Sequence, residues 1–127
     1  MDRTIISTTN APAAIGPYSQ ANRVGDFIFT SGQIPLDPVT GEIAGETVAE
    51  QTARVIENLK AVLEAADSGL DKVIKTTVFL ADISYFAEMN NVYSSYFTGE
   101  NLPSRSAIGV SGLPKGALVE IEAIAIS

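Results

Sequence analysis

The sequence contains no cysteine, no histidine and no tryptophan. Without cysteine, disulfides, thiolate nucleophiles and thiolate metal ligands are all excluded. Without histidine, the chain lacks the side chain that titrates nearest to neutral pH, and we expect no transition-metal site. Any chemistry must therefore use carboxylates, Arg, Lys, Tyr, hydroxyl groups and the backbone.

Long apolar runs and basic patches are also missing. No stretch approaches the roughly 18 uninterrupted apolar residues of a membrane span, and the first residues lead into no secretory-type apolar segment. We therefore expect a soluble, cytoplasmic protein without a membrane role. The net charge is −7 and the eight Lys and Arg residues are scattered, so we expect no nucleic-acid partner.

With 127 residues, 46% of them hydrophobic, the chain has enough apolar material for one core. Gly and Pro residues punctuate the sequence and form no linker, and no fixed-period repeat occurs. These features predict a single domain over residues 1–127.

Two segments have the apolar spacing of amphipathic helices. The first runs over 47–66, with a capping box between Thr47 and Glu50 and a C-terminal stop at Gly69. The second runs over 84–97, with Asp82 or Ser84 as its cap and Gly99 as its terminator. Both helices should pack on a sheet through their apolar stripes.

Five segments have the β-branched and aromatic composition of strands. The last two are expected to pair through a turn at 112–116, which gives an α+β fold with two helices on one sheet face. The strand at 73–80 carries apolar or small residues on both sides, so the sheet face that the helices leave uncovered is also apolar. We therefore expect a homo-oligomer that buries this face, with a monomer as the alternative. The predicted strands are 4–7, 27–31, 73–80, 106–110 and 118–126.

Charged residues on the last two predicted strands are candidates for chemistry. Glu120 and Glu122 share one face of the last strand with apolar residues, and buried carboxylates require a counter-charge or hydrogen-bond donors. Arg105, on the strand predicted to lie alongside, is the natural cation. The pattern fits a structural Arg–Glu pair, or a small-anion site in which the Arg105 guanidinium holds a carboxylate while a Glu orients water.

Several upstream residues add weaker signals. Tyr18 follows a Gly-Pro turn, the Ser31-Gly32 pair ends a strand, and Asn90 lies within the second helix. Taken singly, such a Tyr is more often a packed aromatic, such a Ser-Gly pair an ordinary strand exit, and such an Asn a solvated amide. Only in combination do they become candidates for a binding site.

The chain resembles the RidA (YjgF/YER057c/UK114) family over essentially its whole length. The resemblance lies in five sequence blocks that follow one another in the family's order, which is far more specific than a single short motif. These blocks are NAPAAIGPYSQA at 10–21, TSGQIP at 30–35, KTTVFL at 75–80, PSRSA at 103–107 and LPKGALVEIEA at 113–123.

The resemblance implies a chorismate-mutase-like fold with a mixed sheet, assembled as a trimer around a central sheet-lined barrel, with ligand sites between subunits. It also implies a cofactor-free deaminase, without metal, that hydrolyses 2-imino or 2-enamino acids such as 2-aminoacrylate and 2-aminocrotonate to 2-oxo acids and ammonia. Arg105 would bind the substrate carboxylate, and Glu120 would position or activate water. The remaining implied contacts come from Tyr18, Ser31, Asn90 and the backbone of Gly32 and Ala107.

Two positions depart from the family pattern. Ala107 occupies a position that is often Cys in deaminating members, and 109–112 lacks the Arg commonly found before Leu-Pro-Lys. A non-catalytic module that binds small carboxylates in the same cleft is therefore the main alternative. Ribonuclease activity would lack its usual acid–base pair and electrostatic attraction, and chorismate mutase activity is suggested by fold alone.

Overall fold

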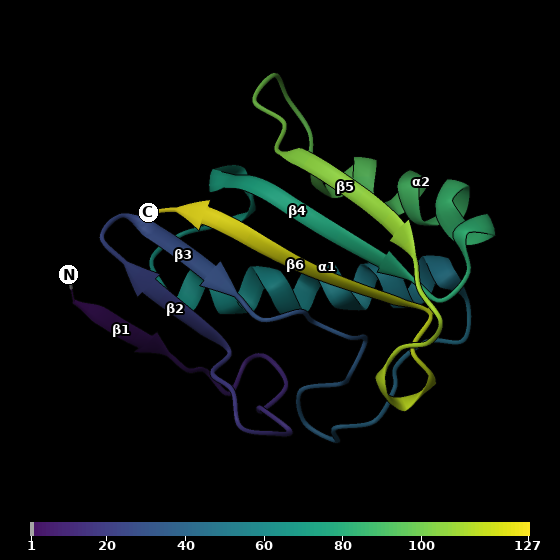
Figure 1. The fold of residues 1–127 in the computed structure, drawn as a ribbon, viewed down its shortest axis with the longest axis horizontal. Helices are drawn as coiled ribbons and strands as arrows, with labels where there is room; N and C mark the ends of the chain where they lie inside the picture. The colour runs from purple at the N-terminus through teal and green to yellow at the C-terminus, as the bar shows by residue number, and fades with distance from the viewer. Residues whose placement is uncertain (1) are drawn as a thin grey trace.

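The computed structural model describes residues 2–127, and its strands form a single six-stranded sheet in the order β1-β2-β3-β6-β4-β5. The pair β4/β5 is parallel and the other neighbours are antiparallel. Both helices lie behind this sheet (Figure 1), so the predicted α+β fold with a mixed sheet and two helices on one face is confirmed. The strands are β1 (Arg3–Ile6), β2 (Ala21–Val24), β3 (Phe27–Thr30), β4 (Val73–Leu80), β5 (Ser104–Gly109) and β6 (Val119–Ile126).

The long helix α1 (Val48–Ala65) begins at the predicted capping box. The Glu50 N–H donates to Thr47 Oγ1, and the Thr47 N–H donates to Glu50 Oε1, each over 3.1 Å. The predicted stop at Gly69 is wrong. Asp67 takes the left-handed conformation with φ of +58°, because a short polar side chain tolerates it, whereas Gly69 is extended.

The second helix, α2 (Phe86–Tyr96), begins two residues later than predicted. A 3₁₀ turn, η2 (Ile83–Tyr85), precedes it, and the predicted cap Asp82 serves this turn by accepting from the Ser84 N–H over 2.8 Å. Two further 3₁₀ turns, η1 (Leu70–Lys72) and η3 (Pro114–Gly116), connect other elements. None of the helices within residues 2–127 is long and apolar enough to cross a membrane.

The sheet contains two features that the sequence did not predict. Strand β2 was missed because Asn22 and Arg23 interrupt its apolar pattern, yet it pairs with β3 through a two-residue turn in which Gly25 has φ of +60°. The predicted pairing of the last two strands is also wrong. The chain crosses over through α2 to place β5 parallel to β4, and β6 then inserts antiparallel between β3 and β4.

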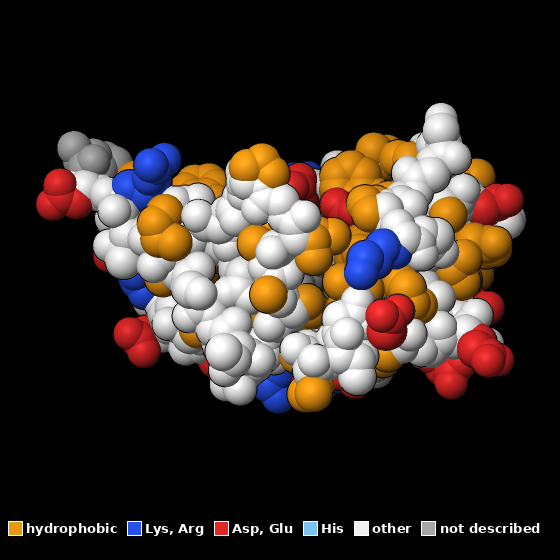
Figure 2. All heavy atoms as spheres, turned by 90° about the horizontal axis from the view of Figure 1, so that it is seen from below, with side chains coloured by type: hydrophobic (Ala, Val, Ile, Leu, Met, Phe, Trp, Pro, Cys, Tyr) orange, Lys and Arg blue, Asp and Glu red, His pale blue; other side chains and the backbone are white. Residues whose placement is uncertain are grey.

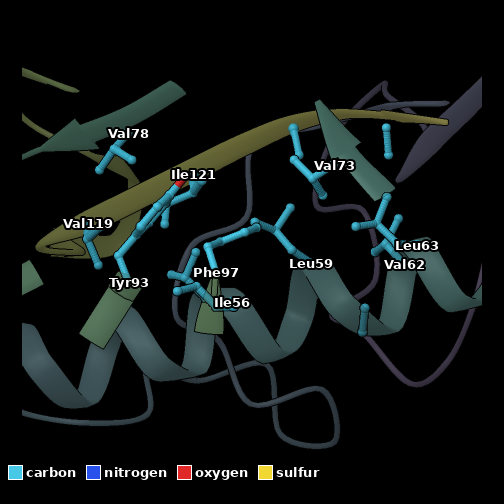
Figure 3. Packing of buried hydrophobic residues seen from close by; sticks show 14 of the residues in the cluster. Ile56, Leu59, Val62, Leu63, Val73, Val78, Tyr93, Phe97, Val119 and Ile121 are labelled. Carbon is cyan, nitrogen blue, oxygen red and sulfur yellow. The ribbon is translucent and has the colours of Figure 1, made fainter. Parts of the chain in front are cut away.

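The core lies between the helices and the sheet. Val55, Ile56, Leu59, Val62 and Leu63 of α1 are completely buried. Figure 3 shows Ile56, Leu59, Val62 and Leu63 between this helix and the sheet. The ring of Tyr93 on α2 stacks on the ring of Phe97, the residue that follows this helix, with centroids 4.4 Å apart. Tyr93 extends toward the sheet (Figure 3). The apolar stripes of both helices therefore cover the same sheet face, as their spacing predicted.

The second face of the sheet is open in a single chain and carries large apolar side chains. Each of these residues is between 39% and 53% exposed. Their neighbours along each strand point to the opposite face, toward the helices. An apolar surface of this kind is typical of a protein interface. The residues are Ile5, Phe27, Phe29, Ile108 and Ile126.

Truncating the centre of the core should cost much of the stability. We expect Leu59→Ala to lower the free energy of unfolding by about 2 to 5 kcal/mol, because it leaves a cavity at a completely buried position. Leu102→Ala, at a position that is 61% exposed, should change it by less than about 0.5 kcal/mol. Urea denaturation measures both, and equal losses would contradict this description of the core.

Candidate active site in two halves

One half of the site is a cavity of about 640 Å³ formed where the loops meet at one end of the sheet. Four of the predicted site residues line it, namely Tyr18, Ser31, Gly32 and Glu120. Seen from this end, hydrophobic side chains gather over the loops, with few charges among them (Figure 2). The apolar part of the lining is Pro12, Ala13, Ile15, Ile34, Leu36 and Pro114.

Buried side-chain amides hold the loops of this half in place. Gln20 accepts from the Thr8 N–H over 2.7 Å and donates to the carbonyls of Thr8 and Pro12 over 3.0 and 2.8 Å. Asn58 of α1, which is completely buried, donates to the carbonyls of Ile34 and Leu36 over 3.2 and 3.0 Å. These amides satisfy backbone groups that would otherwise be buried without partners, and so fix two walls of the cavity.

The sequence analysis did not identify Gln20 or Asn58, although the position of Asn58 in its helix indicated a buried role. Asn58 lies between Val55 and Val62 on the apolar stripe of the predicted helix. An amide at such a position must find hydrogen-bond partners inside the protein. Gln20 gave no comparable signal, because it immediately precedes β2, a strand that was not predicted.

Tyr18 folds back over its own turn. Its hydroxyl oxygen accepts from the Ile15 N–H over 3.1 Å, and its backbone N–H donates to the Gly16 carbonyl over 2.9 Å. The phenolic proton remains available to donate to a ligand. Ser31, by contrast, donates its hydroxyl to the Ser19 carbonyl over 2.6 Å, which ties the strand exit to the Tyr18 loop.

Glu120 packs directly on Gly32. A Cβ atom at Gly32 would lie 2.8 Å from the carboxyl carbon of Glu120, so any other residue there would displace this carboxyl from its present position. Burial raises the pKa of the Glu120 carboxyl above its ordinary value, and the neighbouring Glu122 carboxylate raises it further. The cavity therefore contains a carboxyl group that protonates more readily than an ordinary Glu.

The other half of the site lies on β5 and α2. Arg105 of β5 donates from Nη1 to Oδ1 of Asn90 over 2.6 Å. In the parallel register, Arg105 pairs with Thr76, and Ala107 pairs with Val78. Thr76 and Val78 are buried beneath the helices, so the side chains of Arg105 and Ala107 face the helices too. Ala107 is half-buried against the core. Asn90, Arg105 and Ala107 are thus brought together as predicted residues of one site.

The two halves do not meet within one chain. Strand β4 separates β5 from β6, and Glu120 pairs in register with Phe79 on the open face, while Arg105 faces the helices. The prediction that Arg105 neutralises Glu120 or Glu122 from a neighbouring strand is therefore wrong for a single chain. The error follows from the insertion of β6, which could not be inferred from local sequence.

Removing the charge of Glu122 should lower the pKa of Glu120. We expect Glu122→Gln to bring this pKa closer to its ordinary value without restoring it, because burial, the larger cause, persists. The side-chain carboxyl signal of Glu120 in an NMR pH titration measures the change. Glu64→Gln, on the exposed side of α1, is the control, and an equal shift there would contradict the role assigned to Glu122.

Comparisons with known proteins agree with this fold. Residues 8–127 match the family model described as Endoribonuclease L-PSP. The mouse 2-iminobutanoate/2-iminopropanoate deaminase is 49% identical over 98% of this chain and 91% of its own length. The crystal structure of RidA from the Antarctic bacterium Psychrobacter superposes with a TM-score of 0.93 at 44% identity, covering 98% of this chain and 99% of that one.

A second solved structure, Escherichia coli TdcF with bound serine, has a TM-score of 0.91 and 44% identity, covering 98% of each chain. Identity and coverage at these levels are far above what shared fold alone produces. The chain therefore belongs to the RidA (YjgF/YER057c/UK114) family.

Proposed function

We propose that this protein is a cytoplasmic, cofactor-free deaminase that hydrolyses small 2-imino and 2-enamino acids to 2-oxo acids and ammonia. The observation that carries the proposal is Glu120, a carboxyl of raised pKa that lies over Gly32 in a largely apolar cavity. A raised pKa makes the carboxylate a stronger base than an ordinary Glu and so favours its use in proton transfer. The mouse relative, which carries the name of this activity, supports the same assignment.

The complete site is proposed to form between two copies of the chain. Arg105 and Glu120 face opposite sides of one sheet, so a small substrate that contacts both requires them from different chains. A homotrimer whose open sheet faces line a central barrel would bury the exposed apolar side chains of that face. Asn90, Arg105 and Ala107 of one copy would then face Tyr18, Ser31, Gly32 and Glu120 of the next.

The reaction requires one oriented water and one proton-transferring carboxylate. An enamine first tautomerises to the imine, whose carboxylate is held by the Arg105 guanidinium. Glu120 accepts a proton from water as its oxygen bonds to C2 and the C=N π electrons move to nitrogen. Glu120 then returns the proton to nitrogen, which completes the carbinolamine. It next takes the proton of the new hydroxyl group and delivers it to the amino nitrogen, so that the C–N bond breaks with loss of ammonia while the C=O bond of the 2-oxo acid forms.

Ala107 fits this mechanism without a thiol. Its side chain faces the helix layer and packs on the core, so its backbone is the part available to a ligand. The proposal therefore assigns no chemistry to the side chain at this position.

A coupled assay tests the activity. A threonine dehydratase generates 2-aminocrotonate, and wild-type protein should accelerate the decay of its absorbance, whereas Arg105→Ala and Glu120→Gln should each reduce that acceleration by about 100-fold or more. Tyr85→Phe, which lies outside both halves of the site, is the matched control and should retain activity. A folded, oligomeric wild type that produces no acceleration would contradict the deaminase assignment.

Mixing two inactive variants tests the composite site. After joint refolding of Arg105→Ala and Glu120→Gln chains in equal amounts, about one quarter of the interfaces should pair an intact Arg105 with an intact Glu120 and regain activity. Mixing Arg105→Ala with the double variant is the control and should restore nothing. If both mixtures are inactive while mixed oligomers form, the site does not lie between copies.

A small-carboxylate-binding module is the second candidate function, and the serine-bound TdcF structure favours it. It predicts binding of a 2-oxo acid that depends on Arg105 but no acceleration of imine hydrolysis. The coupled assay therefore separates the two candidates. Ribonuclease activity, which the description of the family names, is less well supported, because the chain has no histidine and a net charge of −7.

A further inference from the structure

Three side chains from one face of α2 surround the Arg105 guanidinium. Phe86, Asn90 and Tyr93 follow the i, i+4, i+7 spacing that aligns residues on one helical stripe. The Arg105 Cζ atom lies 4.7 Å from the Tyr93 ring centroid and 5.3 Å from the Phe86 ring centroid. Both distances are within the range of cation–π attraction, and Asn90 adds the hydrogen bond.

Tyr93 is itself rigidly held. Its hydroxyl shares a 2.7 Å hydrogen bond with Thr76 Oγ1, and its ring stacks on Phe97. Figure 3 shows the side chain reaching from α2 to the sheet. Because Thr76 is also the register partner of Arg105, the ring is fixed relative to the strand pair that carries the guanidinium.

The charge of the Arg105 guanidinium is attracted to the face of the Tyr93 ring. Burial raises the pKa of the Tyr93 phenol, so the side chain remains neutral and offers the cation its π electrons. Ring contacts use none of the five guanidinium N–H donors, and Asn90 uses one through Nη1. Within residues 2–127 the other donors have no hydrogen-bond partner, so they can form a bidentate pair with a carboxylate.

We propose that Tyr93, assisted by Phe86, is a positioning residue that holds the Arg105 guanidinium in the orientation that receives the substrate carboxylate. This inference rests on the proposed role of Arg105 as the carboxylate anchor. A residue that acts only through Arg105 affects ground-state binding of carboxylates, and it affects the water-activating step at Glu120 little. A residue with only a core role would affect stability and leave binding unchanged.

Two substitutions at Tyr93 separate the ring from the hydroxyl. Tyr93→Leu removes the ring face and should raise KM for 2-aminocrotonate about tenfold, with kcat changed less than about threefold. It should weaken binding of the product 2-oxobutanoate, measured by calorimetry, by a similar factor. Tyr93→Phe keeps the ring and loses the Thr76 bond, so KM should stay within about twofold while the thermal midpoint falls.

Val62→Ala is the core control. It shortens a completely buried side chain of α1 that lies away from Tyr93 (Figure 3), and it should lower the thermal midpoint while KM stays within about threefold. A Tyr93→Leu protein that folds and retains wild-type KM would overturn the proposal, as would an equal rise of KM in Val62→Ala. If Tyr93→Leu does not fold, Phe86→Leu at the half-exposed helix start provides the test, with an expected rise of about threefold.

The binding measurement keeps this inference distinct from the deaminase assignment. If wild type binds 2-oxobutanoate but lacks activity, a tenfold loss in Tyr93→Leu still supports the positioning role, and unchanged binding overturns it. If wild type does not bind 2-oxobutanoate, Arg105 is not a carboxylate anchor and the proposal is wrong.

Discussion

The position of β4 between β5 and β6 is the constraint on which the site depends. Its register brings Thr76 beside Arg105 on one neighbour and Phe79 beside Glu120 on the other. Because successive side chains of a strand point to opposite faces, this register sends the guanidinium toward the helices and the carboxyl toward the open face. A slip of one residue would exchange the faces and disrupt both the core and the site.

The same constraint explains why the carboxyl of Glu120 is poised for proton transfer. A guanidinium on the same face would favour the ionised carboxylate and lower its pKa. Instead, Glu120 shares its surroundings with Glu122 and apolar loop residues, and its pKa is raised. Within a single chain, therefore, Arg105 does not lower the pKa of this carboxyl.

Local features of this fold could be predicted from the sequence, and long-range pairing could not. The capping box at Thr47 and the apolar stripe of α1 depend on residues within a few positions of one another, and both were found. The strand β2 and the insertion of β6 depend on partners many residues away, so no local pattern reveals them. The candidate site residues were proposed mainly from the family's sequence blocks, whereas only the structure shows that they lie on two faces of the sheet.

The division of the site also links assembly to activity. A single chain that folds perfectly would contain both Arg105 and Glu120, yet would present them on opposite sides of a sheet. If the complete site forms between copies, the exposed apolar residues of the open face, Phe27 and Phe29 among them, affect catalysis without contacting substrate. Burial of that face then supplies the free energy that holds the two halves together, because hydrophobic association scales with the apolar area removed from water. The open face is therefore as much a requirement of the proposed chemistry as the charged side chains themselves.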